Sequence, residues 1–110
     1  MLNLNTNYQI DYSDEAKIDL KEFNRSQRRQ IYKAVNKVSK NPLPQNEGGY
    51  GKPLGNKQGK NLTGHCKIVL MQMGVRVVYK LIRTETVMKI IVIAARADDE
   101  VYDIAAKRNE

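Results

Sequence analysis

Three apolar runs of strand length follow one another closely in the second half of the chain. They span residues 66–73, 75–82 and 87–95, are rich in Val and Ile, and are separated by breaks at Gly74 and at residues 83–86. Parallel pairing needs a crossover of a dozen or more residues, and these breaks are far shorter. The pattern therefore predicts an antiparallel meander of three strands. Residues 8–12 also alternate and could add a fourth strand.

The register of the first hairpin decides which side chains share a face of this sheet. A turn centred on Met73 and Gly74 predicts that Lys67 lies opposite Lys80 and on the same face as Arg76. The other face is then apolar, and it carries Cys66, Ile68, Leu70, Val75, Val77, Tyr79 and Leu81. We therefore expect one face to pack into a core and the other to carry cations.

Three amphipathic helices are predicted around the sheet. Ser13 supplies an N-cap and acidic residues a first turn for a helix over residues 14–23, and Ser26 is placed to cap a second helix that ends before Pro42. The second helix has an apolar stripe made by Ile31, Ala34, Val35 and Val38. Acids at 98–100 and bases at 107 and 108 suit the two ends of a short C-terminal helix.

The predicted fold class is α+β. We expect an N-terminal helical hairpin packed on the apolar face of a small antiparallel sheet, followed by the short C-terminal helix. The length of 110 residues predicts a single domain over residues 1–110.

Residues 41–60 interrupt this pattern with a long basic segment rich in Gly and Pro. They hold all 3 prolines and most of the 7 glycines, without helical or strand periodicity, and we interpret them as a long loop. Lys52, Lys57 and Lys60 could lie against a nucleic-acid backbone, and Tyr50 could stack on a base. The alternative is a mobile insertion whose lysines are only solvated.

Composition limits the compartment and the chemistry. No apolar run approaches the ~18 residues that a membrane span needs, and no signal peptide opens the chain, so we expect a cytoplasmic protein without membrane contacts. With 1 Cys and 1 His there is no disulfide and no metal-ligand set of the Cys/His kind, so neither metal nor cofactor is expected. Cys66 is interpreted as a small buried hydrophobe.

The net charge of +7 is concentrated in the middle of the chain. Basic and acidic residues balance when residues 1–40 and 98–110 are taken together, so the whole excess falls between residues 41 and 97. Each phosphate that Lys or Arg neutralises releases condensed counterions, so a local basic surface favours a polyanion partner.

The candidate chemistry is cationic, because no nucleophile–His–carboxylate set, phosphate-binding loop or carboxylate pair is present. Lys67, Arg76 and Arg96, with Tyr102 just beyond the last strand, suit RNA cleavage in which the ribose 2′-OH attacks the adjacent phosphate. The arginines would bind the phosphoryl oxygens, and Lys67 would act as base if neighbouring cations and burial lowered its pKa. Tyr102 could stack on a base or lie near the attacking hydroxyl. An odd number of residues in the second turn would place Arg96 beside Arg76 and an even number would place it on the other face, and the sequence leaves this open.

Over roughly residues 8–108 the sequence resembles the RelE branch of the RelE/ParE toxin superfamily. The resemblance rests on a combination of positions: Asn61–Gly64, Lys67 and Ile68, Gly74, Arg76–Tyr79, Arg96, Glu100–Tyr102, Ala105, Ala106, Lys107 and Arg108, with residues 8–14, the helix pair and Pro42. It implies a compact α+β fold and a ribosome-dependent endoribonuclease that cuts mRNA in the ribosomal A site. It also implies neutralisation by a cognate antitoxin protein, whose helix would either cover the basic sheet face or displace the C-terminal helix.

The same resemblance implies roles for single residues. Lys67 matches the general base, Arg76 and Arg96 the phosphate-binding and charge-stabilising arginines, and Tyr102 the stacking tyrosine. Where the family tends to have a second strand lysine, this chain has Val69.

Three explanations for Val69 stay open. A loop lysine such as Lys57 or Lys60 supplies the charge, His65 contributes acid/base chemistry, or the activity is weaker. Contacts with RNA and the ribosome are expected from the following residues: Lys52, Lys57, Lys60, Lys80 and His65.

Two other functions remain as alternatives. The ParE branch shares the fold but inhibits DNA gyrase as a protein ligand, and a non-catalytic RNA-binding module would bind RNA without cutting it. The presence of Lys67, Arg76, Arg96 and Tyr102 together favours the nuclease.

Overall fold

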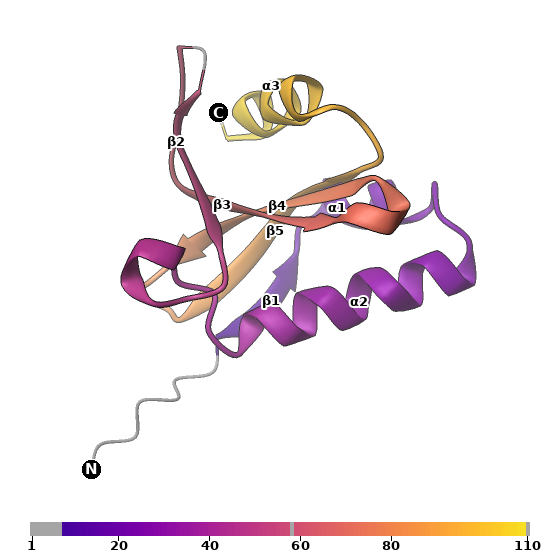
Figure 1. Ribbon diagram of the computed structural model, residues 1–110, viewed down its shortest axis with the longest axis horizontal. Helices are drawn as coiled ribbons and strands as arrows, with labels where there is room; N and C mark the ends of the chain where they lie inside the picture. Colours follow the sequence, from indigo (N-terminus) through magenta and orange to yellow (C-terminus); the bar gives the residue numbers. More distant parts are fainter. Residues whose placement is uncertain (1–7, 58, 110) are drawn as a thin grey trace.

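The computed structural model describes residues 8–57 and 59–109, and it has an α+β architecture in three layers (Figure 1). One sheet with the strand order β1-β5-β4-β3-β2 separates α1 and α2 from α3. The elements are β1 (Gln9–Tyr12), α1 (Asp14–Leu20), α2 (Arg25–Ser39), β2 (Lys52–Lys57), β3 (Lys60–Leu70), β4 (Val75–Ile82), β5 (Val87–Ala94) and α3 (Asp98–Arg108). Within the described ranges no helix is long and apolar enough to span a bilayer.

The helical hairpin and its caps differ from the prediction in detail. Ser13 caps α1 as expected and accepts a hydrogen bond of 3.1 Å from the Ala16 backbone N–H, but α1 ends at Leu20, before residue 23. The cap of α2 is Asn24 and not Ser26. Asn24 and Gln27 exchange side-chain-to-backbone hydrogen bonds of 2.8 Å each, and this capping box satisfies two otherwise unpaired N–H groups.

The antiparallel meander is confirmed in strands β3, β4 and β5. Residues 9–12 form the additional strand, β1, which pairs in parallel with β5 and makes the sheet mixed. The predicted register of the first hairpin is wrong by two residues, since Lys67 lies opposite Val78 and His65 opposite Lys80. The turn is a 3₁₀ segment, Met71–Met73, closed by a left-handed Gly74 at φ 66°. Because the shift is even, Lys67 and Arg76 still share a face.

The interpretation of residues 41–60 as one long loop is wrong. Residues 52–57 form β2, an edge strand that pairs antiparallel with β3 and places Lys52 directly opposite Lys67. Pro53 and Gly55 obscured this strand in the sequence, but an edge strand tolerates proline, and the register shifts between these two residues.

Residues 41–51 fold back on themselves. The Gly51 N–H donates to Leu43 O at 3.0 Å, and the Gln45 N–H donates to Gly51 O at 2.7 Å. The Tyr79 hydroxyl donates to Pro42 O at 2.7 Å from inside the core. A Cβ at Gly51 would lie 2.1 Å from that hydroxyl, so glycine is required there.

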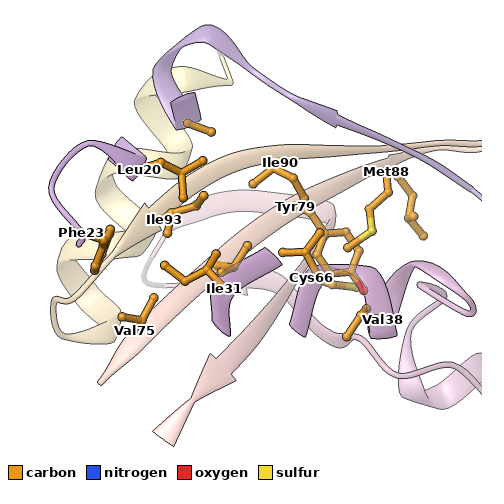
Figure 2. Close-up of a cluster of buried hydrophobic side chains, with 14 residues drawn as sticks. Leu20, Phe23, Ile31, Val38, Cys66, Val75, Tyr79, Met88, Ile90 and Ile93 are labelled. Carbon is orange, nitrogen blue, oxygen red and sulfur yellow. The ribbon is translucent and has the colours of Figure 1, made fainter. Parts of the chain in front are cut away.

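The sheet carries a core on each face. Figure 2 shows the first, in which Ile31 and Val38 of α2 meet Cys66 and Tyr79 of the sheet. Cys66 is 1% exposed and burial raises the pKa of its thiol, which agrees with its interpretation as a buried hydrophobe. The second core fills the space under α3 and contains Leu54, Leu62, Val78, Ile91, Val92, Val101, Tyr102 and Ala105. The expected cationic face is therefore half covered by α3, and its cations lie around the helix.

Candidate active site

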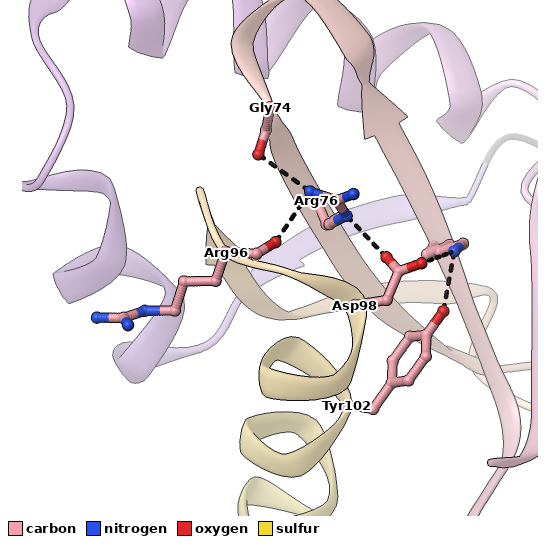
Figure 3. A network of polar contacts seen from close by, with 6 residues as sticks. Gly74, Arg76, Arg96, Asp98 and Tyr102 are labelled. Atoms are coloured by element: carbon pink, nitrogen blue, oxygen red, sulfur yellow. Dashed lines mark hydrogen bonds and ion pairs between the residues drawn. The ribbon is translucent and has the colours of Figure 1, made fainter. Parts of the chain in front are cut away.

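Four polar side chains from three elements meet on the face of the sheet that α3 covers (Figure 3). Lys67 lies on β3, Arg76 on β4, and Asp98 and Tyr102 lie four residues apart on α3. A spacing of four residues puts two side chains on one side of a helix. The first turns of α3 therefore hold a carboxylate and a phenol against the two strand cations.

The Asp98 carboxylate bridges the two cations. Its Oδ1 accepts a hydrogen bond from Arg76 Nε at 2.7 Å, and its Oδ2 accepts one from Lys67 Nζ at 3.2 Å. Lys67 Nζ also donates to the Tyr102 hydroxyl at 2.8 Å and lies 5.4 Å from the centre of that ring. Arg76 Nη1 donates to the backbone oxygens of Arg96 at 2.9 Å and Gly74 at 3.3 Å. Two oxygens of one anionic group thus contact both cations.

The protonation of Lys67 differs from the expectation. Burial alone would lower the pKa of Lys67, but the hydrogen bonds to Tyr102 and Asp98 outweigh burial and raise it. For Asp98, burial would raise the pKa, but the hydrogen bonds from Arg76 and Lys67 lower it. The prediction of a lowered lysine pKa is therefore wrong for this arrangement, in which both partners are held in their charged forms.

Arg96 does not join the other three predicted residues through its side chain. The turn of residues 83–86 is even, which alone would put Arg96 on the far face, but an irregularity between Val78 and Tyr79 restores the parity and sets Ala94 opposite Arg76. The chain then bends after Ala94. The Arg96 guanidinium points away from Asp98 in Figure 3, is 59% exposed, and forms an ion pair of 3.3 Å with Glu100.

The predicted RNA-contacting lysines have different surroundings. Lys60 pairs with Asp103 at 2.8 Å, and Lys80 donates to Asn109 Oδ1 at 3.3 Å. Lys57 is half-buried at the far end of β2. Lys52 is exposed and shares a face with Lys67, because the two residues are direct partners across β2 and β3.

His65 cannot contact RNA in this conformation, contrary to the expectation. Its side chain is 1% exposed, and neither ring nitrogen has a well-formed hydrogen bond among the described residues. Burial lowers the pKa of His65; the backbone at Thr63 opposes this, and the nearby Lys80 cation adds to it. His65 is therefore a neutral, buried ring on the strand that carries Lys67.

Asp98 is the residue that sequence reasoning missed. It was interpreted only as an acid that suits the start of a helix, and it does lie in the first turn of α3. Its spacing of four residues from Tyr102 was the available signal, because a tyrosine facing the sheet implies that Asp98 faces it too.

Comparison with known proteins supports the fold. No family model matches the sequence, and no curated protein matches it significantly. Among solved structures, a double mutant of the E. coli toxin RelE in the free state is 25% identical, with a TM-score of 0.74 over 94% of this chain and 98% of that one. The toxin–antitoxin complex RelBE2 from Mycobacterium tuberculosis is 24% identical, with a TM-score of 0.60 over 83% of this chain and 93% of that one. The intact E. coli RelBE toxin–antitoxin complex is 22% identical, with a TM-score of 0.62 over 82% of this chain and 98% of that one.

Proposed function

We propose that this chain, a RelE-type member of the RelE/ParE toxin superfamily by its structure, is the toxin of a type II toxin–antitoxin system. Its activity is that of a ribosome-dependent endoribonuclease that cleaves mRNA in the A site and so inhibits translation. The observation that carries this proposal is the bridging carboxylate: Lys67 and Arg76 hold two oxygens of one anion beside the Tyr102 hydroxyl.

The Asp98 carboxylate stands where a scissile phosphate would bind. A phosphodiester also offers two anionic oxygens, which Arg76 Nε and Lys67 Nζ would bind as they now bind Oδ1 and Oδ2 of Asp98. The ion pairs that substrate must displace are partly screened, since the side chain of Asp98 is 41% exposed and those of Lys67 and Arg76 are 17% and 27% exposed, and we assign them about 1 kcal/mol each. RNA can therefore replace Asp98 at modest cost.

Lys67 is then next to the phosphate and the ribose 2′-OH. The phosphate replaces one anionic neighbour of Lys67 by another, so burial and the Arg76 cation are what favour its neutral amine. The neutral amine accepts the proton of the ribose 2′-OH, whose oxygen bonds to phosphorus while the bond to the 5′-oxygen breaks. The leaving oxygen takes a proton from solvent, and the products are a 2′,3′-cyclic phosphate and a 5′-OH.

Two further cations complete the proposed site. Arg96 is held only by an exposed ion pair with Glu100, so it can turn toward charge that develops on the phosphate. Lys52 takes the place of the missing lysine at Val69, because it lies opposite Lys67 on the same face, whereas Lys60 is engaged by Asp103. Tyr102 holds Lys67 through its hydroxyl. Its side chain is buried, at 8% exposure, in the second core, so the expected base stacking would require α3 to move.

A cognate antitoxin is the proposed protein partner, and the ribosome with its mRNA is the proposed RNA partner. Complexes of the RelBE type among the structural neighbours support the first. The excess of basic residues between positions 41 and 97 supports the second.

The second candidate is a non-catalytic RNA-binding module. The observation that favours it is the saturation of Lys67 and Arg76 by Asp98, which keeps the pKa of Lys67 raised. If RNA bound on the surrounding cations without displacing Asp98, Lys67 would stay protonated and no base would be present.

Cleavage mapping separates the two candidates. Purified protein is incubated with a defined mRNA, with and without programmed ribosomes, and the new 5′ ends are mapped. We expect cuts inside A-site codons only with ribosomes, and their loss in Lys67→Ala, Arg76→Ala and Arg96→Ala. Lys107→Ala is the matched control, because Lys107 is exposed at the far end of α3. Intact mRNA in every tube would refute the nuclease, and gyrase inhibition would be assayed next.

A further inference from the structure

Helix α2 carries a row of cations on its solvent side. Arg25, Arg29, Lys33 and Lys37 follow one another at intervals of four residues, and all four are exposed. We call this set the α2 basic stripe. A rise of 1.5 Å per residue spaces its members by about 6 Å along one side of the helix. No Asp or Glu occurs anywhere in α2.

This pattern opposes the stability of the helix that carries it. Like charges four residues apart repel each other, and cations in a first turn face the positive end of the helix dipole. Helices α1 and α3 both place acids in the first turn and a base in the last. Helix α2 has no acid in its first turn and begins with Arg25. The charge rule that the chain follows twice is therefore broken in α2 alone among its three described α-helices.

The stripe has no structural role inside the described part of the chain. None of its four members forms an ion pair or a side-chain hydrogen bond there, although Lys60, Arg76, Arg83, Arg96 and Arg108 all do. The neighbouring Arg28 shows the contrast, since its Nη1 donates to Phe23 O at 2.6 Å and so ties the segment between α1 and α2 to α2. The stripe is free to bind a polyanion.

The stripe also lies apart from the candidate active site. Helix α2 covers one face of the sheet and α3 the other, so the stripe and the Lys67–Arg76–Tyr102 cluster are on opposite layers (Figure 1). The molecule measures 43 × 35 × 25 Å. A single strand seated at the cluster does not cover the stripe on the other side.

We propose that the α2 basic stripe is a second RNA-binding surface, which holds the phosphate backbone of a base-paired RNA. Single-strand surfaces stack bases on free aromatic rings. The one aromatic residue of α2, Tyr32, is 41% exposed, but the pair it forms with Tyr12 fixes its ring in an edge-to-face contact, with the ring centres 5.7 Å apart. A row of four cations with one fixed ring beside it fits a duplex backbone, which proteins contact largely by shape and through phosphate. That the duplex is part of ribosomal RNA rests on the proposed function.

The test measures binding of a fluorescein-labelled RNA duplex of 20 base pairs by anisotropy, without ribosomes, between 50 and 200 mM KCl. The stripe variant combines Arg29→Gln, Lys33→Gln and Lys37→Gln. Its matched control combines Lys17→Gln, Lys21→Gln and Lys107→Gln, which removes the same charge from exposed positions elsewhere. We expect the stripe variant to lose about tenfold or more in affinity, and its salt slope to fall by about 2–3, at close to 0.9 per phosphate contact. The control should stay within about twofold of the parent.

Folding is checked by thermal unfolding, where the stripe variant should be at least as stable as the parent because its like-charge pairs are removed. Equal losses in the stripe variant and the control would overturn the proposal, since net charge alone would then explain binding. The proposal would also be overturned if the parent protein bound the RNA duplex and polyglutamate of the same charge with equal affinity. Because the assay contains no ribosome, its failure is distinct from a failure of mRNA cleavage.

Discussion

Asp98→Asn tests whether the carboxylate competes with RNA for Lys67 and Arg76. The substitution keeps the size of the side chain and removes its charge, so both cations lose an anionic partner. Each of these partly exposed ion pairs contributes about 0.2–1 kcal/mol, or about 0.4–2 kcal/mol together. That amount no longer opposes binding, which predicts that RNA affinity rises by about 2- to 30-fold.

The assay is anisotropy with a short RNA that carries a 2′-deoxy sugar at the scissile position, so that binding is measured without cleavage. Asp14→Asn is the control, because Asp14 is also an acid in the first turn of a helix but belongs to α1. Both variants lose one negative charge and a helix-dipole interaction of about 0.3–1 kcal/mol. Equal affinities of the two variants would refute the idea that Asp98 occupies a phosphate site.

The same substitution predicts a change in pH dependence. Lys67 acts as base only when neutral, so cleavage should rise with pH toward its raised pKa. Without Asp98 the rising limb of kcat/KM, which reports the free enzyme, should move to lower pH, because one cause of the raised pKa of Lys67 is gone. The Lys67–Asp98 ion pair also contributes to folding stability within a range of pH. The contribution of Asp98 is lost as pH falls through the lowered pKa of Asp98 in the folded state. The contribution of Lys67 is lost as pH rises through the raised pKa of Lys67 in the folded state. An unchanged rate profile would show that Lys67 is not the base.

Three further predictions concern the neighbourhood of the site. Tyr102→Phe removes the hydroxyl that accepts from Lys67 at 2.8 Å and keeps the ring, so we expect a loss of about 0.5–1.5 kcal/mol in urea unfolding with unchanged RNA affinity. Cleavage should rise at lower pH, because one cause of the raised pKa of Lys67 is removed. Arg108→Gln breaks the bidentate pair with Asp19 and the bond to Ile91 O, which should cost about 1–3 kcal/mol in the same measurement, whereas Lys107→Gln should change little. Because burial lowers the pKa of His65, the folded state favours the neutral ring, and stability should fall as pH drops below about 6.5 and level off below the lowered pKa. Thermal melts between pH 7.5 and 5 check this, and His65→Leu should remove that part of the slope.

The features that could be predicted from the sequence depend on neighbouring residues. The meander followed from apolar runs with short breaks, and the pairing of Lys67 with Arg76 on one face followed from the two-residue period of strands. Strand β2 was missed because Pro53 and Gly55 argue against a strand, whereas an edge strand needs fewer ladder hydrogen bonds. The first register was misplaced because Gly74 was taken as the centre of the turn, while its left-handed conformation closes it.

Asp98 could not be assigned its role in this way, because that role depends on where α3 crosses the sheet. An acid at the start of a helix is already explained by the helix dipole, so the sequence pattern indicates no further partner for it. Only the packing of Val101, Tyr102 and Ala105 on Val78 and Val92 turns that side of the helix toward Lys67 and Arg76. The second core under α3 therefore sets the electrostatics of the candidate site. Any change that loosens this core should free the two cations together, since a single carboxylate holds both.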